Sequence, residues 1–190
     1  PVSDGLGLGT GSFALMVAVQ NLIWGIGQPI AGGLADRFGT RRVLVVGAVI
    51  YAGGLLVLAE ATGPMGLHVG GGVLMGVGMA AASFSVVLAA IGRLVDESRR
   101  SFALGVATAA GSVGQFTLIP LARILIEATS WETAMLVMAG LTALIIVFCV
   151  PLRDPEKTAE NQEVEIGEDE TLREVFARAS RNKSYLFLNA

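Results

Sequence analysis

The residues best suited to chemistry in this sequence are charged side chains at the ends of long apolar stretches. Asp36 closes one such stretch, and Arg37, Arg41 and Arg42 follow it within six residues. A carboxylate at the end of an apolar helix is costly unless it is paired. We therefore expect Asp36 to meet an arginine or the positive N-terminus of another helix. The pattern predicts a charged contact, and we assign no catalytic residue.

Two of the apolar stretches carry polar residues along one face, within about 100° of arc on a helix of 3.6 residues per turn. Polar side chains are expensive in lipid, so such stripes must face protein or a wet cavity. We expect them to line a substrate path; the alternative is helix–helix hydrogen bonding without a ligand. The two sets are Gln20, Asn21, Trp24 and Gln28, and Thr108, Ser112, Gln115 and Arg123.

Arg123 is the only lysine or arginine inside an apolar stretch. A cation within a membrane span is by default a functional-site hypothesis, and an anionic substrate group would be its natural partner. Two alternatives stay open. Arg123 lies close enough to the outer end to extend its side chain into the interface, and Glu127 at i+4 offers a partner on the same helix.

These residues require long membrane helices to hold them. The chain is 53% hydrophobic with 25 glycines, and its mean hydropathy is +0.68, which is typical of polytopic membrane proteins. Five apolar runs each have the ~20 residues needed to cross a hydrocarbon core. We expect an all-α membrane protein with antiparallel spans near residues 13–35, 43–61, 67–91, 102–126 and 131–152.

Charge and small residues refine this arrangement. Twelve of the 13 lysines and arginines lie after the first, third and fifth runs, which predicts that these links are cytoplasmic. Gly39 supplies the backbone freedom for a tight reversal. Small residues repeat at i+4 in Gly72, Gly76 and Ala80, and again in Gly105 and Ala109. These repeats predict close helix approach.

The stretch over residues 32–42 reads G-x-L-A-D-R-F-G-x-R-R and resembles the loop between the second and third helices of the major facilitator superfamily. The resemblance implies that the five spans are helices two to six of twelve, with helices two and five lining a cavity. Thr40 stands where the family often has a basic residue. The implied cytoplasmic gate consists of Gly32, Asp36, Arg37, Gly39, Arg41 and Arg42.

The chain divides into a lead-in at 1–12, which has no lysine or arginine and is expected outside, a five-helix bundle at 13–152, a loop at 153–183, and an apolar end at 184–190 that is expected to start a further helix. The resemblance implies that the loop at 153–183 is the cytoplasmic central loop. Nine of the 16 acidic residues lie within 154–174, which favours a solvated linker. The expected partners are a small-molecule substrate, the lipid bilayer, and the missing first helix and C-terminal half of the same protein. We expect the bacterial inner (plasma) membrane.

Within the superfamily, Gln28-Pro29 and the segment A-T-A-A-G-S-V-G-Q at 107–115 are similar to monocarboxylate and oxalate–formate exchangers. This implies a secondary transporter that moves a small organic anion, such as a monocarboxylate, by alternating access. Drug or sugar transport by the same fold and a membrane sensor without transport are the alternatives. One His and one Cys argue against a membrane enzyme, and we expect no metal, cofactor or nucleic acid.

Overall fold

The computed structural model describes residues 9–149. They belong to the first of two compact units, Pro1–Asp154, and the second unit, Pro155–Ala190, lies outside the described residues. Most of the predicted lead-in, the predicted cytoplasmic loop at 153–183 and the predicted start of a further span at 184–190 therefore fall outside the part of the chain described below.

Within residues 9–149, five helical spans are long and apolar enough to cross a membrane, and no strand occurs. The prediction of an all-α membrane fold with five spans is confirmed. The first, third and fourth helical spans are longer than the predicted apolar runs at both ends, because a helix can continue on its own hydrogen bonds. The second span begins earlier than predicted and ends at Ala59 rather than at residue 61. The spans are Thr10–Phe38, Thr40–Ala59, Pro64–Leu94, Glu97–Ala128 and Trp131–Cys149.

Helix α2 (Thr10–Phe38) and helix α3 (Thr40–Ala59) are joined by Gly39 alone. The sequence predicted a charged loop over 32–42, whereas the structure keeps Asp36 inside the helix and reverses the chain at one residue. Gly39 has φ 94° and ψ 140°, the one positive φ in the described part of the chain. A side chain would be strained there, so the predicted role of this glycine agrees with its geometry.

The third span consists of four helical pieces rather than the single helix predicted over 67–91. Three consecutive glycines at 70–72 have low α-helix preference, and the segment that holds them is a π-helix with i→i+5 bonds. The chain leaves the helix at Ala82 (φ −95°, ψ 28°) and Ser83 (φ −70°, ψ 154°). The pieces are α4 (Pro64–Gly66), η1 (Leu67–Leu74), α5 (Met75–Ala81) and α6 (Phe84–Leu94).

The third span packs between α2 and α3 at distances that only small residues permit. A Cβ added at Gly78 would lie 2.5 Å from the Cβ of Tyr51 in α3, and one added at Gly76 would lie 2.9 Å from the carbonyl oxygen of Gln20 in α2. The predicted close approach is confirmed at Gly76, and Gly78 lies outside the predicted repeat. The prediction is wrong at Gly105, where an added Cβ would meet nothing within 4 Å.

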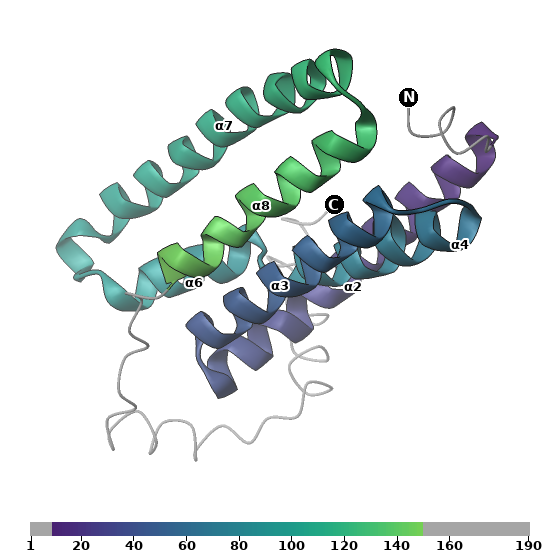
Figure 1. Cartoon of the computed structure of the whole chain (residues 1–190). Helices are drawn as coiled ribbons and strands as arrows, with labels where there is room; N and C mark the ends of the chain where they lie inside the picture. The colour runs from purple at the N-terminus through teal and green to yellow at the C-terminus, as the bar shows by residue number, and fades with distance from the viewer. Residues whose placement is uncertain (1–8, 150–190) are drawn as a thin grey trace. The chain divides into compact units, whose positions relative to one another are not determined.

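Helix α7 (Glu97–Ala128) packs against α6 and α8 (Trp131–Cys149), and α8 lies along α3 (Figure 1). No residue of α7 is buried, which explains the open surroundings of its glycines. An apolar cluster fills the junction of α2, α3, α6 and α8, at the end of the bundle that carries the charged turn. Its buried members are Ala31, Ala35, Val43, Leu44, Val86 and Cys149.

Replacing Gly78 by alanine should destabilise this bundle. The added methyl group would lie 2.6 Å from the backbone N and Cα of Tyr51, and overpacking of this kind costs about 1–3 kcal/mol. We expect the apparent melting temperature of the detergent-solubilised protein, followed by size-exclusion chromatography, to fall by several degrees. Gly53→Ala is the matched control, because a Cβ there meets nothing within 4 Å. Equal melting temperatures for the two variants would contradict the packing described here.

Candidate functional site

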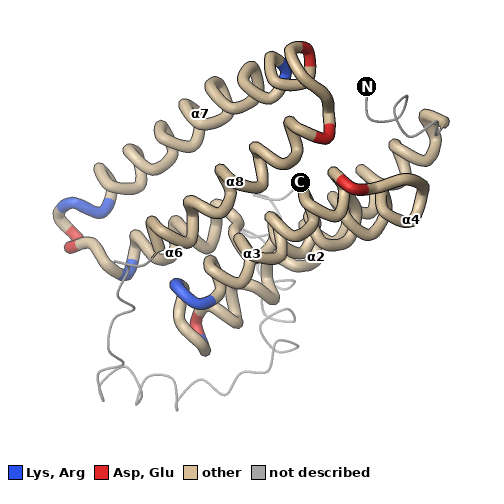
Figure 2. The backbone as a smooth tube through the Cα atoms, viewed as in Figure 1, with Lys and Arg blue, Asp and Glu red and all other residues tan. Residues whose placement is uncertain are grey.

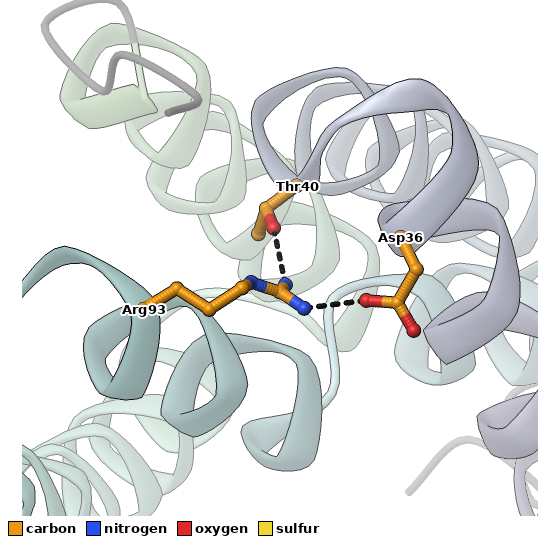
Figure 3. A network of polar contacts seen from close by, with 3 residues as sticks. All are labelled: Asp36, Thr40 and Arg93. Atoms are coloured by element: carbon orange, nitrogen blue, oxygen red, sulfur yellow. Dashed lines mark hydrogen bonds and ion pairs between the residues drawn. The ribbon is translucent and has the colours of Figure 1, made fainter. Parts of the chain in front are cut away.

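Asp36, near the end of α2, binds the guanidinium of Arg93 in the last turn of α6. Arg93 Nη1 donates to Asp36 Oδ1 at 2.5 Å, and Nη2 donates to Thr40 Oγ1 at 3.0 Å. Figure 3 shows the guanidinium between the two acceptors. One side chain therefore ties together the end of α2, the start of α3 and the end of α6.

The position of each charge on its helix explains why the contact forms. The C-terminal end of a helix carries partial negative charge, which disfavours the carboxylate of Asp36 and favours the cation of Arg93. The two side chains are 59% and 41% exposed respectively. A solvent-screened pair of this kind contributes at most about 1 kcal/mol. Such a contact is strong enough to bias a conformation and weak enough to be broken.

The sequence predicted an arginine as one possible partner for Asp36 but did not identify Arg93. The sequence contains a pattern that points to Arg93. This arginine belongs to the basic link after the third run, which is predicted on the same side of the membrane as the turn at Gly39. Thr40 was noted only as a departure from the family pattern. The structure gives its hydroxyl a specific role as the second acceptor for Arg93.

The three arginines of the motif are all exposed at this end of the bundle. Arg37 lies over the ring of Phe38, 5.4 Å from its centroid, which is a cation–π distance. Arg41 and Arg42 lie in the first turn of α3. Figure 2 shows these charges, like the other charged residues in the described part, at the ends of helices. This placement leaves the apolar middle of each span free of charge.

A pocket of about 370 Å³ lies between α2 and α6 beside the ion pair. Its polar lining comes from both helices, and Ser85 Oγ donates to Gln28 Oε1 across it at 3.1 Å. Gly32 of the motif and several apolar side chains complete the wall. The volume falls within the range of sites for small molecules. The polar lining residues are Gln28, Asp36, Ser85 and Arg93.

Of the four path residues predicted in α2, Gln28 is the one that the structure brings to this pocket. Gln20 Nε2 instead donates to Met79 Sδ in α5 at 3.3 Å, and Asn21 donates to the backbone of its own helix. Trp24 is half-buried. Gln20 and Gln28 both hydrogen-bond to the third span. These contacts match the alternative considered from the sequence, in which the polar residues join helices without binding a ligand.

The stripe predicted in α7 remains on an exposed helix surface. The hydroxyls of Thr108 and Ser112 donate to carbonyls one turn earlier, and Gln115 is exposed. Arg123 Nε donates to Glu127 Oε1 at 2.8 Å, with the two side chains 80% and 61% exposed. The i+4 pairing considered from the sequence is therefore present, and the stripe is not brought to the pocket beside Arg93.

Among residues 9–149, no three His, Cys, Asp or Glu side chains lie close enough together to hold a metal ion. Cys149 is buried in the apolar cluster beneath the turn. The contacts described at this end of the bundle are ionic, hydrogen-bonding and cation–π contacts. They suit binding and conformational control.

Comparison with known proteins gives a family and several named relatives. The model of the family described as Major Facilitator Superfamily matches residues 1–189. Monocarboxylate transporter 13 of Bos taurus is 32% identical over 145 residues, which are 76% of this chain and 32% of that protein. Monocarboxylate transporter 12 of Xenopus laevis is 31% identical over 70% of this chain and 28% of that protein.

Monocarboxylate transporter 3 of Gallus gallus is 32% identical over 63% of this chain and 22% of that protein. The matched part of the chain thus spans about a third or less of the length of these relatives.

A double-mutant cycle with Asp36→Asn and Arg93→Gln should show coupling between the two side chains. We expect up to about 1 kcal/mol in the free energy of unfolding, because the pair is direct but screened by solvent. Denaturant titration in detergent micelles measures it. The control cycle uses Arg123→Gln and Glu127→Gln, an exposed i,i+4 pair for which a smaller coupling is expected. Strictly additive effects at Asp36 and Arg93 would argue against the contact.

Proposed function

The chain belongs to the major facilitator superfamily, and on that premise we propose that it is part of a secondary transporter that carries a small monocarboxylate by alternating access. Family membership and five apolar spans make it a multi-pass integral membrane protein and indicate a transporter rather than an enzyme. The predicted resemblance to the family and to its monocarboxylate branch is confirmed. The proposed substrate class rests on the names of the relatives, which are monocarboxylate transporters.

The observation that carries the proposed mechanism is the Arg93 guanidinium held jointly by Asp36 and Thr40. Alternating access needs contacts that are made in one conformation and broken in another, and a ligand acts by favouring one of the two. The exposure and modest strength of this pair suit such a contact. We propose a gate formed by Gly32, Asp36, Arg37, Gly39, Arg41, Arg42 and Arg93.

We propose that the polar stripes of α2 and α7 line the substrate path. Gln28 supports this because it already reaches the pocket beside the gate. Arg123 supports it because its exposed guanidinium holds a carboxylate, that of Glu127, and an anionic substrate offers the same group. The path residues are Gln20, Asn21, Trp24, Gln28, Thr108, Ser112, Gln115 and Arg123.

We propose that the face with the turn at Gly39 is cytoplasmic, because lysines and arginines gather on the links at that side. The relatives described above come from animals. A location in the bacterial inner membrane therefore stays a prediction from the sequence.

Counterflow tests the transport proposal. Liposomes that contain the full-length protein and an unlabelled monocarboxylate should accumulate the same labelled monocarboxylate from outside, whereas the neutral amide of equal size should neither enter nor compete. Arg123→Gln should lower the initial rate by about tenfold or more, because a charge-assisted hydrogen bond to the substrate carboxylate would be lost.

Arg100→Gln is the matched control, since Arg100 is an exposed arginine in the first turns of the same helix. Carboxylate uptake that survives Arg123→Gln would keep the transport proposal and remove Arg123 from the path. If no carboxylate enters, the substrate class is wrong. Competition by drugs and sugars would then test the other transport functions, and ligand binding without flux would indicate a sensor.

Asp36→Asn should shift the balance between conformations. Removal of a screened ion pair changes the ratio of two states by up to about fivefold. Spin labels on cysteines at Leu34 and Leu94, which are both exposed, report the separation of the α2 and α6 ends by double electron–electron resonance. In Asp36→Asn we expect a larger fraction of molecules with a long distance between the two labels. In the control Glu97→Gln we expect the same distance distribution as in the wild type. Identical distance distributions would rule out a gating role for the pair.

A further inference from the structure

The pocket between α2 and α6 combines small apolar walls with a few convergent polar groups. Residues such as Pro29 and Ala89 contribute apolar surface, and the polar groups come from Gln28, Asp36, Ser85 and Arg93. This composition is the common pattern of a binding site for a small molecule. At about 370 Å³, the space suits a solute of a few heavy atoms together with water.

Two of the polar residues that line this pocket, Gln28 and Arg93, carry N–H groups that can donate to a ligand, and Asp36 is the carboxylate that now accepts from Arg93. A guanidinium has five N–H groups, and within the described residues Arg93 directs one to Asp36 and one to Thr40. The carbonyl oxygen of Gln28 accepts from Ser85, so its amide NH2 is the end that can donate to a ligand. A ligand that accepts hydrogen bonds matches the donors of Gln28 and Arg93, and an ionised carboxylate is such a ligand.

The charges of the lining limit the ligand further. The pocket holds one cation, Arg93, and one anion, Asp36. A dianion would add two negative charges against a single guanidinium, which like-charge repulsion from Asp36 disfavours. A ligand with one negative charge can take the place of the Asp36 carboxylate on the Arg93 guanidinium, and no second cation is needed to balance its charge. The side chain of Arg93 is 41% exposed, so this exchange does not require a buried charge to be stripped of its partner.

We propose that the pocket is a binding subsite for a small monocarboxylate, which displaces the Asp36 carboxylate from Arg93. The choice of ligand rests on the proposed transport function, and the site itself rests on the pocket and its donors. Asp36 is in effect a resident carboxylate on the guanidinium. Substrate that arrives at this face would compete with it, so that entry and the release of the gate contact become the same event.

Protection from labelling tests this site. Ala89→Cys places a reporter in the pocket wall, in full-length protein whose Cys149 and other cysteines are replaced by alanine. Reaction with N-ethylmaleimide is followed while lactate replaces chloride at constant ionic strength. We expect lactate to slow labelling at least threefold and lactamide to leave it unchanged. Ser101→Cys, exposed at the same end of the bundle, is the control reporter and should react at one rate throughout.

Two variants should change the lactate concentration for half protection in opposite directions. Asp36→Asn removes the competing carboxylate, so the lactate concentration for half protection should fall by about two- to fivefold. Arg93→Gln removes the guanidinium, so that concentration should rise by about tenfold or more. Arg93→Lys keeps the charge without the planar guanidinium, so its lactate concentration for half protection should lie between those of the wild type and Arg93→Gln. This variant tests the site even if Arg93→Gln does not fold. Arg100→Gln should match the wild type.

Failure of this inference can be told apart from failure of the transport proposal. Carboxylate counterflow without protection at Ala89→Cys, or protection that is the same in Arg93→Gln and wild type, would overturn the subsite and leave transport intact. A reporter that does not react in chloride would overturn it too, because the pocket would be closed. A further outcome is that lactate protects Ala89→Cys, with the expected changes in Asp36→Asn and Arg93→Gln, while counterflow is absent. That result would support the subsite and overturn the proposal that a monocarboxylate is transported.

Discussion

The backbone contact of the third span with its two neighbours is the constraint on which the rest of the structure depends. Inside a bilayer, apolar side chains gain little by leaving lipid, so helices associate through close packing. Gly76 meets the backbone of α2 and Gly78 meets that of α3, at distances where one methyl group would not fit. The three spans are held as one unit, and α6 extends from its end to the charged turn.

The charged site follows from that framework and from the ends of helices. Asp36, Thr40 and Arg93 come from three helices whose ends meet above one apolar cluster. The carboxylate sits at a helix end that disfavours it, and the guanidinium sits at one that favours it. The contact therefore relieves an unfavourable placement, and it does so where water can compete. The exposure of the pair to solvent follows from its position at the helix ends.

Much of this could be predicted from the sequence because hydropathy and charge act locally. The five spans, the reversal at Gly39 and the need of Asp36 for a partner each follow from a few neighbouring residues. The close approach at Gly76 was also predictable, since small residues at i+4 on a membrane helix have few other uses. The same pattern failed at Gly105 because the described part of the chain provides no helix opposite it.

The rest depended on which helix faces which, and periodicity does not contain that information. It places Gln20 and Gln28 on one face of α2 but does not say that this face meets the third span. The helix break at Ala82 and Ser83 lies inside the apolar run predicted over 67–91, so hydropathy gives no sign of it. The identity of Arg93 as the partner of Asp36 required the path of α6 after that break.

The single-residue turn at Gly39 has a further consequence for how the chain assembles. The entropy lost in closing a loop grows with its length, and here there is almost no loop to close. α2 and α3 can therefore pair as soon as both are helical, at almost no cost in chain freedom. The third span packs between these two helices. The reversal that places α2 and α3 side by side depends on one glycine with a positive φ.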